Sequence, residues 1–324
     1  MSRTLSPGRW RGLRSTADDD GKFTIVAFDQ RRDYRNMLPP DASYEQAVQI
    51  KREVTKALAP PASAMLLDPY YGLQPAMELA RGVGLLMTLE GLGWKGTDTA
   101  REVFVNPDWP LGKIKRFGAA GAKLLVFYHP ESGDLAAKTE QQVRDICDQC
   151  HAYDLPIFVE PMSYSLDATV DKSSAEFAKA RPEIVIETAR RFSQLGCDVL
   201  KLEFPMDAHF DTDRSGWRDA CRAVSDAVDV PWVLLSAGVD YDTFDPQVRI
   251  ACEQGASGFL AGRAIWKEVA QLDDAARQEY IATTVTQRMN QLCAYAKAGV
   301  PWTEFYQPEA VDAEWHTRYQ ALPL

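Results

Sequence analysis

Short runs of β-branched and aliphatic residues recur along the chain, and longer stretches with apolar residues at helical spacing separate most of them. The runs predict about eight strands, at residues 23–28, 64–68, 85–90, 122–127, 156–160, 198–203, 232–236 and 258–261. The helical spacing predicts helices between them, for example at 44–58, 140–153, 181–195 and 246–254. Several of these would carry Pro in the first turn or Gly just past the end, as helix termini prefer. This alternation predicts an α/β fold, a (β/α)8 TIM barrel.

The same pattern sets the extent of the predicted barrel, which covers about residues 23–267. We expect an irregular N-terminal segment to cover it and extra helices to form a C-terminal extension at about 273–324. No linker-like or low-complexity stretch divides the chain. The sequence therefore predicts one domain of 324 residues, a length that α/β barrels reach as a single unit.

Polar residues gather at the carboxyl ends of the predicted strands, and this position separates two fold classes. These residues are Asp29, Asp68, Glu90, Glu160, Lys201 with Glu203, Ser236 and Arg263. A barrel brings all these strand ends to one rim, where barrel enzymes build their active sites. A doubly wound sheet is the structural rival, but the turn after the first strand lacks the G-x-G-x-x-G fingerprint of dinucleotide binding. The pattern therefore favours the barrel.

The predicted strand at 198–203 carries a lysine among apolar residues. Period-2 alternation puts Lys201 and Glu203 on one face, and Leu200 and Leu202 on the other. Because the face toward the helices must be apolar, we expect Lys201 to point into the barrel. Burial lowers the pKa of a lysine, and the neutral amine is a nucleophile toward a carbonyl group.

Two further residues on neighbouring strands fit the same chemistry. Lys123 shares a face of its strand with Leu125, and a second inward cation would lower the pKa of Lys201 further. Glu160 stands at the end of its strand, where it is a natural general acid or base beside an imine. The alternative is that Lys201 and Glu203, or Lys123 and Glu160, form structural ion pairs that catalyse nothing.

Small residues and an arginine follow the last two predicted strands. Ser236-Ala237-Gly238 comes after the seventh strand, and Gly262-Arg263 comes after the eighth. Barrels commonly bind phosphate at these two loops. Small residues let backbone N–H groups approach an anion, and a guanidinium gives it a bidentate contact. The two loops together predict a phosphate site.

Composition and charge exclude several classes of protein. Hydrophobic residues make up 46% and charged residues 25%, which is ordinary for a globular protein. With 36 Lys and Arg against 46 Asp and Glu, the net charge of −10 argues against binding nucleic acid or an anionic membrane. No window is long and apolar enough to span a bilayer, and the N-terminus lacks a secretory signal. We expect a cytoplasmic protein whose six cysteines are reduced thiols.

Three other signals have simple interpretations. Residues 2–14 contain four arginines and no acid, as a transit peptide does, but Pro7 and Gly8 would interrupt a helix there, so we expect an ordinary N-terminal cover. Cys147 and Cys150 stand before a histidine in a helical stretch, with no second ligand pair at zinc-site spacing, so we expect structural cysteines and no metal. Trp302 is expected to be a core or subunit contact.

These residues lie within segments that resemble the class I tagatose 1,6-bisphosphate aldolase family, whose relatives include the sulfofructosephosphate aldolases. The segments are AFDQR at 27–31, LLDP and YGL at 66–73, FVEP at 158–161, DVLKLE at 198–203, LSAGV at 235–239 and AGRA at 261–264. They stand in the family's order and with similar spacing from about Phe23 to Lys267, so together they are far more specific than any one motif.

The resemblance implies a lyase that needs no cofactor, because a Schiff base serves as the electron sink. It implies that Lys201 is the Schiff-base lysine, Glu160 the acid/base, and Lys123 a cation that lowers the pKa of Lys201 and contacts the substrate. The remaining implied roles belong to residues that hold the substrate. Asp29 and Gln30 would bind sugar hydroxyls; Ser236, Arg263 and the amides of Gly238 and Gly262 would bind the C1 phosphate.

The expected reaction is cleavage of tagatose 1,6-bisphosphate to dihydroxyacetone phosphate and glyceraldehyde 3-phosphate, and we expect a homo-oligomer. The segment at 31–35 is more cationic than the tagatose branch predicts, so Arg31 and its neighbours are candidates for the far end of the substrate. Sulfofructose phosphate cleavage and transaldol transfer are therefore alternatives. A non-catalytic sugar-phosphate-binding barrel, or a phosphosugar decarboxylase or isomerase, would use the same fold.

Overall fold

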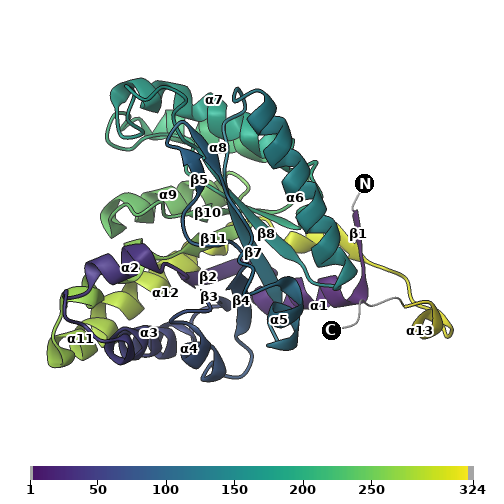
Figure 1. Cartoon of the computed structure of the whole chain (residues 1–324), viewed down its shortest axis with the longest axis horizontal. Helices are drawn as coiled ribbons and strands as arrows, with labels where there is room; N and C mark the ends of the chain where they lie inside the picture. Colours follow the sequence, from purple (N-terminus) through teal and green to yellow (C-terminus); the bar gives the residue numbers. More distant parts are fainter. Residues whose placement is uncertain (1–2, 320–324) are drawn as a thin grey trace.

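The computed structural model describes residues 3–319, and its centre is a closed barrel of eight parallel strands. The strands follow chain order around the barrel (Figure 1). They are β2 (Phe23–Phe28), β3 (Ala64–Leu67), β4 (Gly84–Thr88), β7 (Gly121–Phe127), β8 (Ile157–Met162), β9 (Val199–Leu202), β10 (Trp232–Leu235) and β11 (Gly258–Ala261). The predicted TIM barrel is thus confirmed, with β11 pairing with β2 to close it.

Helices cover the barrel on all sides, and Figure 1 shows α6, α7 and α8 along one side and α3, α4 and α11 along the other. The helices that follow barrel strands include α3 (Tyr44–Leu58), α4 (Leu73–Met77), α5 (Leu111–Arg116), α6 (Asp134–Ala152), α7 (Ala175–Phe192), α8 (Arg214–Ala227) and α9 (Tyr241–Glu253). Nearly every barrel strand residue is buried, because helices pack on one face and side chains fill the other.

Three predicted helix starts are too late, because α6 begins at Asp134 and not at residue 140, and α7 and α9 also begin early; helix capping explains the last two. Helices α7 and α9 begin at Ala175 and Tyr241, before the predicted starts at 181 and 246, so Pro182 and Pro246 lie inside them and not in the first turn. The side chain of Ser174 accepts a hydrogen bond from the backbone N–H of Phe177, and Asp240 accepts one in the same way. These caps satisfy the free N–H groups of the first turn and fix where each helix starts.

The N-terminal cover consists of a strand and a helix, β1 (Arg3–Leu5) and α1 (Pro7–Thr16). The expectation that Pro7 and Gly8 interrupt a helix is wrong, because Pro7 occupies the first turn, where its missing N–H costs nothing. Residue 2 of the predicted segment lies outside the described residues. Helix α1 contacts β4 and β7, and β1 pairs with β12 (Tyr306–Pro308).

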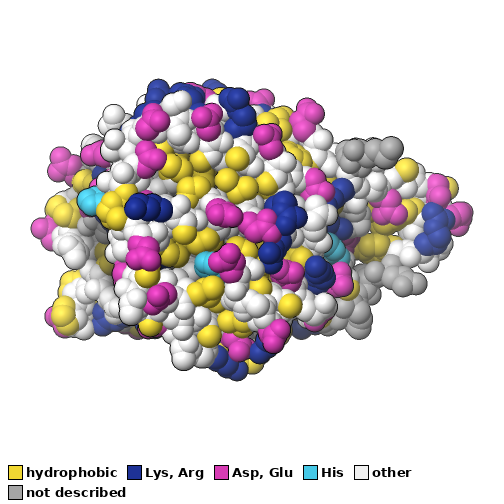
Figure 2. Space-filling view, turned by 90° about the horizontal axis from the view of Figure 1, so that it is seen from above, with side chains coloured by type: hydrophobic (Ala, Val, Ile, Leu, Met, Phe, Trp, Pro, Cys, Tyr) yellow, Lys and Arg dark blue, Asp and Glu magenta, His cyan; other side chains and the backbone are white. Residues whose placement is uncertain are grey.

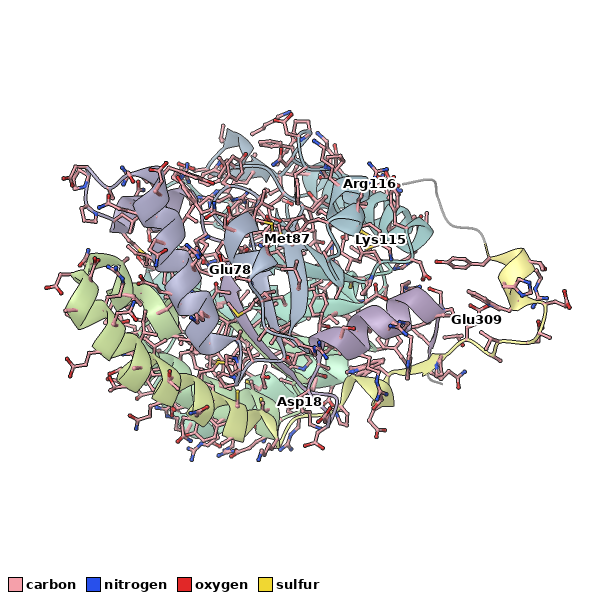
Figure 3. All side chains as sticks on the ribbon, turned by 90° about the horizontal axis from the view of Figure 1, so that it is seen from below. Asp18, Glu78, Met87, Lys115, Arg116 and Glu309 are labelled. Carbon is pink, nitrogen blue, oxygen red and sulfur yellow. The ribbon has the colours of Figure 1, made fainter. Side chains whose placement is uncertain are left out.

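The C-terminal extension follows β11 as a series of helical segments, of which α11, η2 and α12 run end to end without a break; Figure 3 shows it from below. They are α10 (Arg263–Trp266), η1 (Lys267–Gln271), α11 (Asp274–Tyr280), η2 (Ile281–Val285), α12 (Thr286–Ala296), η3 (Trp302–Glu304) and α13 (Trp315–Arg318). Helix α12 packs against α9, and Trp302 lies in the core with its ring edge against Trp10. Residues 320–324 of the predicted extension lie outside the described residues.

Two elements beside the strand ends were not predicted. Helix α2 (Arg32–Met37) occupies most of the cationic segment after β2. A small hairpin, β5 (Lys95–Thr97) and β6 (Ala100–Glu102), follows β4.

Figure 2 shows acidic and basic side chains intermingled on the face seen from above. Among residues 3–319, no helix has the length and apolar character needed to cross a membrane.

Candidate active site

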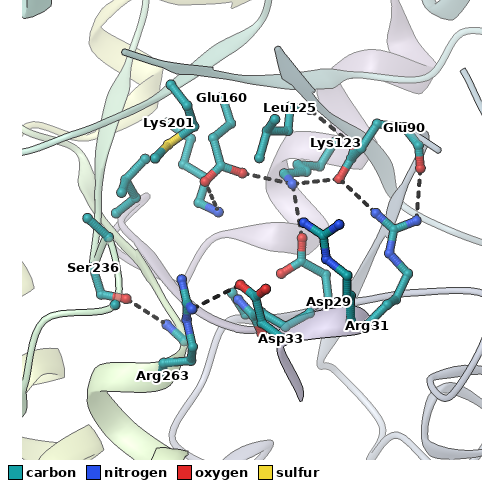
Figure 4. Close-up of a pocket in the computed structure, with 18 of the residues that line it drawn as sticks. Asp29, Arg31, Asp33, Glu90, Lys123, Leu125, Glu160, Lys201, Ser236 and Arg263 are labelled. Carbon is teal, nitrogen blue, oxygen red and sulfur yellow. Dashed lines mark hydrogen bonds and ion pairs between the residues drawn. The ribbon is translucent and has the colours of Figure 1, made fainter. Parts of the chain in front are cut away.

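A cavity of about 260 Å³ opens at the carboxyl ends of the barrel strands (Figure 4). All ten site residues predicted from the sequence line this cavity: Asp29, Gln30, Arg31, Lys123, Glu160, Lys201, Ser236, Gly238, Gly262 and Arg263. They come from six barrel strands, or from the loops directly after them, that are far apart in the sequence. The closed barrel alone brings them together, because it places the end of each strand on one rim.

Lys201 points into the cavity from β9, as the alternation of that strand predicts. Its Nζ lies 2.8 Å from Oε1 of Glu160, and Oε2 of the same carboxylate lies 2.8 Å from Nζ of Lys123. All three side chains are almost completely buried. Glu160 therefore bridges the two lysines, with the geometry needed to exchange a proton with Lys201.

Lys123 is surrounded by carboxylates. Besides Glu160, its Nζ contacts Oδ2 of Asp29 at 3.0 Å and Oε1 of Glu90 at 2.8 Å. Burial alone would lower the pKa of Lys123, but these three carboxylates outweigh burial and raise its pKa well above the ordinary value. Lys123 therefore stays an ammonium ion. Among residues 3–319, Lys201 has one ion-pair partner, Glu160, so the two buried lysines stand in different environments.

Asp29 is held in its ionised form. Burial would raise its pKa, but the charges of Lys123 and Lys201 dominate and hold that pKa well below the ordinary value. Its Oδ2 accepts a hydrogen bond from Lys123, whereas its buried Oδ1 has no partner within the described part of the chain. The side-chain oxygen of Gln30 is also buried and unpartnered. Buried acceptors without donors are costly in a folded protein, so both oxygens are suited to accept hydrogen bonds from ligand hydroxyls.

Two predicted rim residues lie outside the cavity. Asp68 is paired with Lys51 from α3 and accepts hydrogen bonds from the backbone of Tyr70 and Tyr71. Glu203 was expected on the face of Lys201, but β9 ends at Leu202 and the alternation ends with it. Glu203 instead contacts Lys172, so the alternative of a Lys201–Glu203 ion pair is wrong.

The loops after β10 and β11 form the other end of the cavity. Ala237 and Gly238 have φ angles of 46° and 81°, a left-handed conformation that is uncommon for alanine and typical of strained functional loops. A Cβ atom on Gly238 would lie 3.1 Å from a guanidinium nitrogen of Arg263, so glycine leaves room for that group. Oγ of Ser236 lies 3.4 Å from the backbone N of Gly262, which donates to it. Arg263 itself pairs with Asp33 of α2, with Nη1 3.0 Å from Oδ2.

The three arginines of the cationic segment have different surroundings. Arg31 is tied to the segment after β4, since its Nη1 donates to the Glu90 carbonyl at 2.9 Å and its Nη2 lies 3.6 Å from the Glu90 carboxylate. Arg35 donates to two proline carbonyls away from the cavity. Arg32 lines the cavity 5.9 Å from the ring centre of Trp94, and within residues 3–319 it has no ion pair or hydrogen bond.

Sequence reasoning left out Glu90, Asp33 and Trp94 as site residues, although all three line the cavity. The sequence did contain a signal for Glu90, because this polar residue stands at the carboxyl end of a predicted strand. Asp33 and Trp94 had none, because their places depend on α2 and on the chain that enters the hairpin after β4.

Within residues 3–319, no three His, Cys, Asp or Glu side chains are grouped as metal ligands. Cys147 and Cys150 are free and buried, and burial raises the pKa of both thiols.

Comparison with known proteins identifies the family of the chain. The family model described as DeoC/LacD family aldolase matches residues 23–268, which include the whole barrel. The chain belongs to this family of aldolases. It is therefore an enzyme, a lyase, and the alternatives of a non-catalytic barrel, a decarboxylase or an isomerase are not supported.

Curated relatives resemble the aldolase over nearly its whole length. Tagatose 1,6-diphosphate aldolase 2 of Streptococcus pyogenes serotype M3 is 31% identical, covering 94% of this chain and 99% of the relative. Tagatose 1,6-diphosphate aldolase 2 of Streptococcus mutans serotype c is 32% identical, with coverage of 93% and 98%. The tagatose 1,6-diphosphate aldolase of Lactococcus lactis subsp. lactis is 30% identical, with coverage of 93% and 99%.

Solved structures share the fold at lower identity. A Schiff-base-forming fructose-1,6-bisphosphate aldolase matches with a TM-score of 0.56 and 20% identity, over 86% of this chain and 99% of the other. The fructose-bisphosphate aldolase of Plasmodium falciparum matches with a TM-score of 0.66 and 15% identity, over 92% and 97%. At these identities the match establishes the barrel fold alone.

Proposed function

We propose that the aldolase cleaves tagatose 1,6-bisphosphate through a Schiff base on Lys201, giving dihydroxyacetone phosphate and glyceraldehyde 3-phosphate. The names of the curated relatives support the substrate. The contrast between the two buried lysines supports the mechanism. Lys123 is held as an ammonium ion by three carboxylates, whereas Lys201 has a single ion-pair partner among the described residues, Glu160, which can take its proton.

In this mechanism the neutral amine of Lys201 attacks C2 of the ketose. The resulting carbinolamine loses water with a proton from Glu160, and a protonated imine remains. Glu160, now a carboxylate, removes the proton of the C4 hydroxyl. The C3–C4 bond then breaks, its electron pair moves to the iminium as an enamine, and the aldehyde leaves. Protonation of the enamine at C3 and hydrolysis of the imine release dihydroxyacetone phosphate and restore Lys201.

The other cavity residues would hold the two ends of the substrate. Ser236, Arg263 and the glycine amides after β10 and β11 would bind the C1 phosphate. Asp29 and Gln30 would accept hydrogen bonds from sugar hydroxyls through their unpartnered oxygens. In the cationic segment, Arg32 is the arginine with a guanidinium that lines the cavity and has no described partner, so it would meet the far anionic group. Arg31 would affect the substrate only indirectly, through its contacts with Glu90.

Sulfofructose phosphate is the second candidate substrate. Arg32 carries one positive charge at the far end, whereas the carboxylate of Asp33 pairs with Arg263 at the C1 phosphate end. This local charge suits a sulfonate with one negative charge better than a phosphate with two. A homo-oligomeric state, a cytoplasmic location and the absence of nucleic-acid binding stay predictions from the sequence.

A coupled assay tests the proposed reaction. Purified enzyme is mixed with tagatose 1,6-bisphosphate or sulfofructose phosphate, and the dihydroxyacetone phosphate formed is reduced by a coupling dehydrogenase. We expect turnover of at least one substrate and none by the Lys201→Met variant, which keeps the bulk of the side chain. Lys138→Met is the matched control, because Lys138 is exposed on α6 and pairs with Glu102 away from the cavity. Full turnover by Lys201→Met would refute the mechanism.

A further inference from the structure

The β8–β9 pair carries Glu160 and Lys201, yet its paired register stops short of both residues. It consists of Phe158 opposite Val199 and Val159 opposite Leu200. Each strand is paired further on its other side, with Glu160 opposite Leu125 of β7 and Lys201 opposite Val233 of β10. The backbone ladder therefore does not fix the gap between the two strand ends, which is where the 2.8 Å contact between Lys201 and Glu160 lies.

A buried carboxylate beyond the ladder joins the same two strand ends. Glu203, two residues after Lys201, accepts hydrogen bonds from the backbone N of Ser163 at 2.7 Å and from its Oγ at 2.6 Å. Ser163 follows directly after β8, three residues beyond Glu160. The other oxygen of Glu203 contacts Nζ of Lys172 at 2.5 Å, and that ammonium also donates to the carbonyl of Ser163 at 2.8 Å. Ser163 is thus held at its N–H, its hydroxyl and its carbonyl.

These contacts keep Glu203 charged although the residue is only 2% exposed. Burial by itself would raise its pKa, but Lys172, Arg181 and the Ser163 hydroxyl lower it. A fully buried carboxylate that lies outside the cavity has no substrate to touch. Its donors all come from the chain that follows the acid/base residue, so its effect on the reaction passes through the position of that strand end.

We propose that Glu203 is a positioning residue that clamps the ends of β8 and β9 through Ser163, and so sets the distance between Glu160 and Lys201. This inference rests on the proposed Schiff-base function of Lys201. Displacement of a reacting group by about 1 Å costs up to about a hundredfold in rate, so loss of the clamp reduces the chemical step. Binding of the C1 phosphate, which involves β10 and β11, stays nearly unchanged.

Graded variants separate this role from a structural one. Glu203→Gln keeps an acceptor for Ser163 and gives up the contact with Lys172, whereas Glu203→Leu removes both. We expect Glu203→Leu to lower kcat about 10- to 100-fold with KM within about threefold, and Glu203→Gln to recover most of that loss. Ser163→Ala removes only the hydroxyl donor and should lower kcat several-fold. Ser165→Ala is its matched control, since the Ser165 hydroxyl donates to the exposed carbonyl of Asp167.

The rate of borohydride trapping of the imine, measured on folded protein with dihydroxyacetone phosphate, completes the test. The wild type is measured first, because failure to trap Lys201 there would refute the proposed function and not the clamp. If the imine is trapped in the wild type, and is trapped equally fast in folded Glu203→Leu with an unchanged kcat, Glu203 has no positioning role. If Glu203→Leu does not fold, the serine pair decides: equal kcat for Ser163→Ala and Ser165→Ala overturns the proposal, and a selective loss in Ser163→Ala supports it.

Discussion

Arg263 should determine how tightly the aldolase holds the C1 phosphate, and its pairing with Asp33 makes this testable with two substitutions. The side chain of Arg263 is 27% exposed, and its Nη1 lies 3.0 Å from Oδ2 of Asp33. A charge-assisted hydrogen bond contributes about 1.5–3 kcal/mol. Since about 1.36 kcal/mol corresponds to tenfold in rate, Arg263→Ala should lower kcat/KM by roughly 10- to 150-fold.

Asp33 competes with the phosphate for the same guanidinium, so its removal should act in the opposite direction. Asp33 is 51% exposed, and exposed ion pairs contribute about 0.2–1 kcal/mol. Asp33→Ala should therefore raise kcat/KM by roughly 1.4- to 5-fold, and this gain should vanish when Arg263 is also alanine.

The assay is steady-state kinetics of the two single variants and the double variant on tagatose 1,6-bisphosphate and sulfofructose phosphate. Because both substrates share the C1 phosphate, Arg263→Ala should weaken both by a similar factor. A gain from Asp33→Ala that persists without Arg263 would refute the competition. If Arg263→Ala altered the preference between the two substrates, the substrates would lie in the cavity in the reverse orientation, with the tail group and not the C1 phosphate at Arg263.

The remaining predictions concern the far end of the substrate, the electron sink and acid stability. Arg32→Ala should change the preference between a phosphate and a sulfonate tail while the KM for dihydroxyacetone phosphate in the reverse reaction stays nearly constant; an unchanged preference would contradict the assignment. Chelation with EDTA should leave kcat unchanged, because the iminium on Lys201 accepts the electrons of the breaking bond; loss of activity that zinc restores would contradict it. The pKa of Asp29 is held well below its ordinary value of 3.8, so its charge stabilises the fold fully above about pH 5, and this contribution is lost progressively as the pH falls from there toward the lowered pKa. Asp29→Asn should therefore show a shallower loss of unfolding free energy between about pH 5 and pH 2, measured by urea denaturation, and an unchanged slope would contradict the ion pairing.

The local pattern of apolar residues was sufficient to predict the barrel. Its strands are buried on both faces and read as continuous apolar runs, so Phe23–Phe28 and Gly258–Ala261 have the predicted bounds. The starts of α7 and α9 were missed because prolines are strong local signals, whereas the capping hydrogen bond of Ser174 is seen only in three dimensions. The hairpin at β5 and β6 was missed because its short strands are exposed or half-buried and carry no apolar alternation.

The candidate site was predictable as a set of residues but not as a set of contacts. Strand-end polarity identified the rim, and the alternation in β9 gave the direction of Lys201. Which carboxylates surround Lys123 depends on pairs such as Asp29 and Lys123, whose partners stand 94 residues apart in the chain. The alternation failed at Glu203 because it holds only within a strand, and β9 had already ended. The sequence could not separate Arg31 from Arg32, because only the fold brings Glu90 beside Arg31.

Borohydride trapping with peptide mapping is the decisive test of a Schiff base on Lys201, because it reports both the covalent chemistry and the lysine that performs it. The enzyme is incubated with dihydroxyacetone phosphate and reduced, and the adduct is located by mass spectrometry of the digested protein. Lys201→Met and Lys138→Met are treated in parallel. We expect one adduct per chain on Lys201 with loss of activity, none in Lys201→Met, and an unchanged adduct in Lys138→Met. An adduct on Lys123, or no adduct in an enzyme that is turning over its substrate, would contradict it.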